Sequence, residues 1–152
     1  MIEGLHRKLT SALLLFFAFW DAILAAGALA APALWFRFFH DAPVVDPQAL
    51  LARTGAIWAA FAIFHLIAWR VWQRKPYWLA IVGGMRLGEI FADLTYLFLA
   101  ESTTVAGRIA LLVAAPSNVI FSIYFILTFV KIERRTAEAS AAGTPVSTAG
   151  TA

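Results

Sequence analysis

The 152-residue chain has too few charged side chains to cover the surface of a soluble domain. Hydrophobic residues make up 62% of the sequence and charged residues 14%, with a mean hydropathy of +0.79, whereas a soluble domain has about 25% charged residues. We therefore predict an integral membrane protein of the all-α class, because helices satisfy their own backbone groups in lipid.

The absence of cysteine excludes disulfide bonds, thiolate metal sites and cysteine nucleophiles. The net charge is only +3, and the basic residues flank apolar stretches instead of clustering in a basic patch. That distribution is typical of membrane topology signals. We accordingly expect no nucleic-acid partner.

The first apolar stretch covers residues 9–34, after a short polar N-terminus at residues 1–8. Basic residues, an apolar core and Ala28-Leu29-Ala30 give its start the appearance of a signal peptide. The stretch continues past that point and contains Asp21, so we predict an uncleaved first span. Residues 35–52 are predicted to be a loop, with interfacial aromatic residues at 35–40 and a short interfacial helix near 47–52.

Three further apolar stretches are long enough to cross a bilayer, at residues 53–72, 77–100 and 109–130. The hinge at residues 73–76 is short and basic, so the second and third spans should be antiparallel neighbours. Residues 132–152 are charged and then rich in Ala, Ser, Thr and Gly, and we predict a disordered tail. The expected architecture is a four-helix bundle with up-down-up-down topology.

The basic residues lie mostly on one side of the predicted spans, which sets the orientation. The N-terminus, the second loop and the C-terminal segment carry eight of them: Arg7, Lys8, Arg70, Arg74, Lys75, Lys131, Arg134 and Arg135. The opposite side carries Arg37, Arg53 and Arg108. Both termini are therefore predicted to face the cytoplasm across a bacterial inner membrane.

The third span carries three charges at membrane depth, Arg86, Glu89 and Asp93. Their spacing of i, i+3 and i+7 puts them on one helical face. A charge in the hydrocarbon costs a few kcal/mol even at the low end of the estimates, about 2.5–3.5 kcal/mol. Other helices must therefore cover this face.

Each of the other spans also carries a polar side chain at depth: Asp21, His65 and Asn118. At 1.5 Å per residue, Asp21, Glu89 and Asn118 each lie roughly 15–18 Å from the cytoplasmic boundary, with His65 and Arg86 at roughly 10–12 Å. These side chains could converge inside the bundle.

Two interpretations of this polar cluster stay open. In the structural one, Arg86 pairs with Glu89 or Asp21 and Asn118 hydrogen-bonds to them, which holds helices together. In the functional one the cluster is a site. Three acids face one certain cation, so we expect one acid to keep a proton, because burial disfavours the charged form.

No cofactor or metal is expected. His65 is the only histidine at membrane depth, which argues against a haem with two histidine ligands, and the acids lack a diagnostic metal spacing. Gly84 and Gly88 form a small-residue motif nearly opposite the charged face. They are predicted to allow close helix packing, either within the bundle or at a homodimer interface.

The chain resembles the small four-helix bacterial membrane proteins loosely grouped as DoxX-like. The resemblance covers roughly residues 10–130 and is carried by Trp20-Asp21, Pro32, Arg53-Thr54-Gly55 and the hinge at 73–76. It implies a four-helix membrane bundle. DoxX-like proteins proper are associated with quinone-linked redox complexes, but no quinone or metal motif is matched here.

The expected function is that of a non-enzymatic accessory subunit, or of a protein that binds a lipophilic small molecule through the polar cluster. The alternative is a membrane enzyme acting on a lipid or quinone, with Glu89 or Asp21 as proton donor. Expected partners are membrane lipids, a lipophilic ligand, and a second copy or a larger membrane complex.

Overall fold

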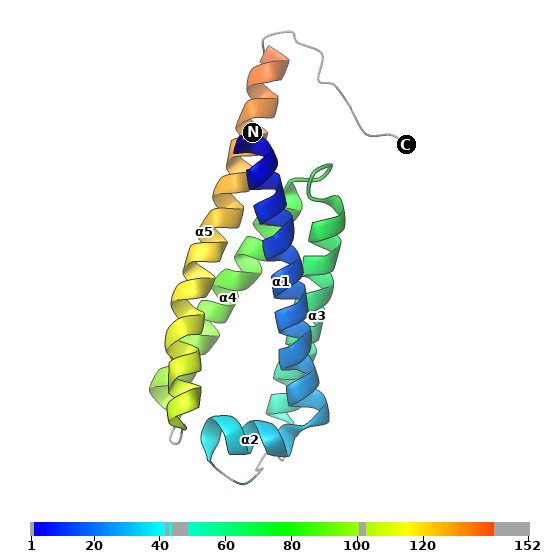
Figure 1. Ribbon diagram of the computed structural model, residues 1–152. Helices are drawn as coiled ribbons and strands as arrows, with labels where there is room; N and C mark the ends of the chain where they lie inside the picture. Colours follow the sequence, from blue (N-terminus) through cyan, green and yellow to red (C-terminus); the bar gives the residue numbers. More distant parts are fainter. Residues whose placement is uncertain (1, 42, 44–48, 101–102, 142–152) are drawn as a thin grey trace.

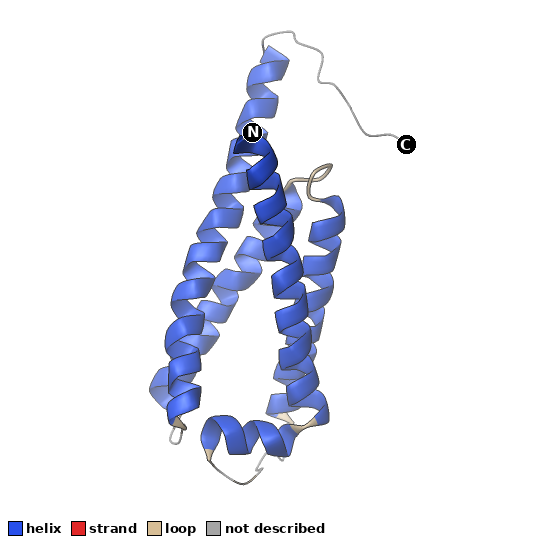
Figure 2. Cartoon of the chain, in the orientation of Figure 1, coloured by secondary structure: helices blue, strands red, loops and turns tan. Residues whose placement is uncertain are grey.

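The computed structural model describes residues 2–41, 43, 49–100 and 103–141. Every regular element in these ranges is a helix (Figure 2). In chain order the helices are α1 (Ile2–Ala30), α2 (Pro32–His40), α3 (Leu50–Val71), α4 (Tyr77–Leu99) and α5 (Val105–Ala141). The all-α prediction is confirmed.

Among the described residues, three helices are long and apolar enough to cross a membrane. They contain the stretches Gly4–Ala30, Leu50–Val71 and Val105–Ala141. Helix α4 has a comparable length of 23 residues but carries Arg86, Glu89 and Asp93. These features indicate a multi-pass membrane protein.

Some predicted boundaries differ from the structure. The first long helix ends at Ala30, and Pro32 starts α2, because proline suits the first turn of a helix but interrupts a continuing one. Residues 35–40, predicted to be loop, are therefore helical. Of the interfacial helix predicted near 47–52, residues 47–48 lie outside the described residues, and residues 50–52 form the first turn of α3.

The tail also differs from the prediction of disorder. Helix α5 continues through Ala141, about three turns beyond the predicted end of the fourth span. An ion pair between Arg134 and Glu138, one turn apart, supports this exposed extension. Residues 142–152 lie outside the described part of the chain.

The long helices form two close pairs, α1 with α3 and α4 with α5 (Figure 1). Small residues allow each close approach. A Cβ atom added to Gly55 on α3 would lie 2.9 Å from the Ala28 Cβ on α1. On α4, a Cβ at Gly83 would lie 2.9 Å from Ile126 Cγ1, and Ser122 Oγ donates a 2.8 Å hydrogen bond to the Gly83 carbonyl.

Large buried side chains join the two pairs at one end only. They are Leu14, Phe17, Trp72, Leu79, Val82 and Phe125. All of them lie on the same side of the level of Asp21 and Arg86, away from α2. Towards α2, every buried residue in the described ranges is alanine or glycine: Ala25, Ala28, Gly55, Ala62, Gly107 and Ala115. The pairs diverge in this direction (Figure 1).

Helix α2 lies across the divergent end and connects the two pairs. At its start, Trp35 contacts Gly27 on α1 and lies 5.2 Å from the Trp58 ring of α3. At its end, the Thr104 N–H donates to the Phe39 carbonyl at 2.9 Å, just before α5 begins. Helix α2 therefore acts as a brace that joins the two pairs at the end where the buried residues are small.

The predicted close packing of Gly84 and Gly88 within the bundle is wrong. Both glycines are exposed, and an added Cβ would meet nothing within 4 Å at either position. Their neighbour Gly83 makes the contact with α5 instead. The reason is angular, since one residue along a helix rotates the side-chain direction by about 100°.

Replacing Gly107 by alanine should loosen the brace. The new Cβ would lie 2.5 Å from the Phe39 carbonyl oxygen, which is backbone and cannot swing aside. We expect Gly107→Ala to lower the free energy of unfolding in mild detergent by about 1–3 kcal/mol. The matched control is Gly84→Ala, which should be neutral or stabilising, because alanine favours a helix over glycine by about 1 kcal/mol. Equal effects of the two changes would contradict this role of α2.

Candidate functional site

One polar side chain from each long helix meets at the level where the apolar core ends. These four residues, which we call the polar layer, are Asp21 of α1, His65 of α3, Arg86 of α4 and Asn118 of α5. Their exposed fractions are 0%, 0%, 3% and 7%. The layer therefore lies inside the bundle, as the sequence spacing predicted.

An ion pair between Arg86 and Asp21 connects the two helix pairs. Arg86 Nη2 donates to Asp21 Oδ2, and both side chains are almost fully buried. The guanidinium carbon also lies 4.4 Å from the centre of the Phe17 ring, in a cation–π arrangement. Of the two partners that the sequence left open for Arg86, the structure pairs it with Asp21 and not with Glu89.

His65 lies beside the same carboxylate. Its Nδ1 is 2.8 Å from the Phe61 carbonyl oxygen and 3.3 Å from Asp21 Oδ2. Both neighbours are acceptors, so Nδ1 carries a proton. In the neutral ring, Nε2 is then a bare acceptor, and this buried atom has no hydrogen-bond partner within the described residues. The His65 ring also packs against an aromatic residue, with 5.6 Å between the centres of the His65 and Phe17 rings.

The other two acids are held by neutral donors. Trp58 Nε1 donates to Glu89 Oε2 at 3.0 Å, and Asn118 Nδ2 donates to Asp93 Oδ2 at 3.1 Å. Asn118 Oδ1 in turn accepts a long hydrogen bond of 3.5 Å from Arg86 Nη1. Within the described ranges neither Glu89 nor Asp93 makes an ion pair.

The six polar residues that the sequence predicted to converge are linked by hydrogen bonds or by interactions between their charges. They are Asp21, His65, Arg86, Glu89, Asp93 and Asn118. Glu89 interacts with the charges of Arg86 and Asp21, and Asp93 with those of Glu89 and Arg86. Glu89 and Asp93 are only half-buried and lie on the α2 side of Arg86. The surplus of acid is therefore on the side where large buried side chains are missing.

The polar layer also contains unsatisfied atoms. Asp21 Oδ1, His65 Nε2 and Arg86 Nε are buried and lack a hydrogen-bond partner among the described residues. Such an atom costs about 1–3 kcal/mol when left unpaired. The layer thus offers unmet hydrogen-bonding capacity to a small molecule or to water.

The described residues hold no group of three or more His, Cys, Asp or Glu side chains arranged to bind a metal ion. A shallow groove of about 470 Å³ lies along α4, lined by Phe91, Ala92, Thr95, Tyr96, Leu99 and Ala100. Thr95 is half a turn from Arg86 by helical steps of about 100°. The lining of the groove therefore extends from Thr95 on the outer side of α4 to Tyr96 on its inner side.

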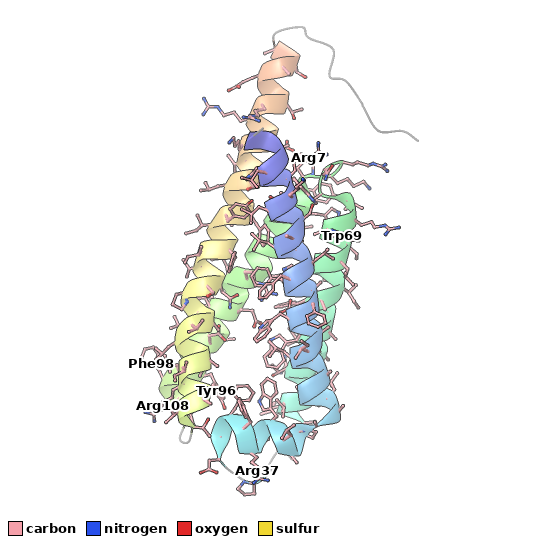
Figure 3. All side chains as sticks on the ribbon, viewed as in Figure 1. Arg7, Arg37, Trp69, Tyr96, Phe98 and Arg108 are labelled. Carbon is pink, nitrogen blue, oxygen red and sulfur yellow. The ribbon has the colours of Figure 1, made fainter. Side chains whose placement is uncertain are left out.

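Several contributing residues were missed by the sequence reading. Trp58 lies seven residues before His65, so both are on one side of α3, and its indole holds Glu89. Tyr96 has the same spacing from Glu89, and its hydroxyl lies 2.6 Å from His40 Nδ1 on α2. Figure 3 shows Tyr96 on the inner side of α4, whereas Phe98 points away from the bundle.

Breaking the buried ion pair should destabilise the protein more than removing it. Arg86→Met leaves the Asp21 charge without its counter-charge, and loss of one partner typically costs about 3–5 kcal/mol. The double variant Arg86→Met with Asp21→Asn should recover part of that loss. Unfolding in mild detergent measures both.

The control is Arg7→Met, because Arg7 is exposed and hydrogen-bonds only to Gln73 in the described structure. It should change the free energy of unfolding by less than about 0.5 kcal/mol. A single Arg86→Met variant as stable as the wild type would show that the guanidinium is not held between the helix pairs.

No protein-family profile, no curated protein and no solved structure matches this chain. The function has to be inferred from the polar layer and its surroundings.

Proposed function

We propose that the chain crosses a bacterial inner membrane four times, as an up-down-up-down bundle with both termini in the cytoplasm. Three crossings are those of α1, α3 and α5, and α4 would be the additional one. Helix α4 can lie in the membrane because its charged side chains are turned towards the polar layer. Its outer side carries exposed apolar residues such as Leu87, Phe91 and Leu99. A membership of the DoxX-like group is part of this proposal and rests on the sequence resemblance alone.

Within this bundle we infer a binding site for a lipophilic small molecule. The observation that carries it is the position of Glu89 and Asp93, half-buried at the boundary where large core side chains give way to alanine and glycine. Indole rings of Trp35 and Trp58 flank this region. An apolar ligand with a polar head would find aromatic walls and unmet hydrogen-bonding groups there.

The alternatives use the same layer differently. In an accessory subunit the Arg86–Asp21 pair would only fix the helices. In a membrane enzyme acting on a lipid or quinone, Glu89 or Asp21 would donate a proton. The enzyme draws support from Glu89, whose carboxyl is half-exposed and held by one neutral donor. Turnover without stable ligand retention would favour the enzyme over the binding protein.

Reporter fusions test the topology. A cytoplasmic reporter should be active at the C-terminus and at Arg74-Lys75, and an exported reporter should be active at Pro43. A C-terminus outside the cytoplasm would rule out the proposed orientation or one of the four crossings.

Native mass spectrometry from mild detergent tests ligand binding. The wild-type protein should retain a lipophile as an added mass, and Glu89→Leu should lose it because the polar contact is gone. Phe98→Leu is the control, since Phe98 is 77% exposed on the outer side of α4. No added mass in the wild type, or an equal one in Glu89→Leu, would contradict the binding function.

The same spectra report the number of copies. Gly84 and Gly88 lie on the outer face of α4, so a homodimer through them should become a monomer in Gly84→Leu. A wild-type spectrum of monomers alone would exclude this dimer.

A further inference from the structure

We infer that the polar head of the bound molecule is a protonated amine, so that the ligand is a lipophilic ammonium compound. This inference rests on the proposed binding function and specifies its ligand class. The observations are a shortage of hydrogen-bond donors, a surplus of carboxyl groups and an aromatic wall beside them.

The shortage of donors follows from the atoms that lack partners. Asp21 Oδ1 and His65 Nε2 are unpaired acceptors, on side chains that are both fully buried. His65 Nε2 is the acceptor of the neutral ring, because Nδ1 faces two acceptors and must then be the donor. Arg86 Nε is the one unpaired buried donor within the described ranges. A ligand that donates several hydrogen bonds could pair with these acceptor atoms, and an ammonium group donates up to three.

The charges point the same way. Asp21 is neutralised by Arg86, and His65 already donates towards the same oxygen. Glu89 and Asp93 then add two carboxyl groups whose hydrogen bonds come from an indole and an amide. A cationic head would favour the ionised form of these carboxyl groups and supply their counter-charge, whereas an anionic head would disfavour that form.

Two indole rings lie beside the carboxyl groups and give an apolar wall for the body of the ligand. The indole that holds Glu89 belongs to Trp58, whose ring lies 5.2 Å from that of Trp35 on α2. A ligand beside Glu89 would therefore meet the N–H edge of the Trp58 indole, with the Trp35 ring behind it. The apolar body of the ligand would extend towards the divergent end of the bundle, where large buried side chains are missing.

A series of three probes with one apolar cage tests the charge. They are 1-adamantylamine, which is protonated at neutral pH, 1-adamantanol and 1-adamantanecarboxylate. Binding to the full chain in detergent is followed by titration calorimetry. We expect the amine to bind at least tenfold more tightly than the alcohol, with no measurable binding of the carboxylate.

Two isosteric variants locate the effect. Glu89→Gln and Asp93→Asn keep an oxygen for Trp58 and Asn118 but remove the charge, so each should weaken amine binding at least tenfold and leave alcohol binding unchanged. The control is Glu138→Gln, an acid exposed on the α5 extension, which should change neither. Circular dichroism confirms that each variant is folded.

The inference is overturned if the alcohol binds as tightly as the amine, if the amine does not bind, or if both isosteric variants bind it normally. Failure here with a neutral lipophile retained in native mass spectrometry would leave the proposed binding function intact. Failure with no retained lipophile would remove both.

Discussion

The rest of the structure depends on the buried ion pair between Arg86 and Asp21. Within each helix pair, small residues let the backbones approach, and those contacts are local to the pair. Between the pairs, the guanidinium of one reaches the carboxylate of the other. Lipid can solvate neither group, so the bundle holds its charges only when both pairs are present and in register. If the two helix pairs separated, Arg86 and Asp21 would each be left as an uncompensated charge in the membrane, so the ion pair requires the pairs to pack together.

That register explains why packing differs at the two ends. On one side of the polar layer, Leu14, Phe17 and Phe125 fill the space between the pairs. On the other side the buried residues are alanine and glycine, which cannot fill a gap between diverging helices. The α2 brace therefore holds the divergent end by hydrogen bonds at Thr104 and by the indole of Trp35. Large apolar side chains such as leucine at that end would fill the space between the pairs and pack them more closely.

Hydropathy and helical spacing were enough to predict the helical class, the long helices and the convergence of the six polar residues. They could not choose between Glu89 and Asp21 for Arg86, because both were within reach and the choice depends on three-dimensional packing. Nor could they separate Gly83 from Gly84, which differ only by the rotation of one residue. Residues 32–34 of α2 were assigned to the first span and residues 35–40 to the loop, because helix-breaking residues follow from Asp41 onward. The α5 extension was missed because it has no buried apolar face.

The composition of the polar layer argues against a purely structural role. An ion pair that only holds helices together needs one acidic and one basic side chain, and Asp21 and Arg86 already form such a pair. Replacing a buried charged set with apolar residues is often neutral or stabilising. Glu89 and Asp93 nevertheless add two acids on the same face, half-buried and held by neutral donors. Both acids interact with the charge of Arg86, but within the described ranges neither forms an ion pair with it. Stability alone gives no reason for this arrangement, whereas a positively charged ligand would complete it.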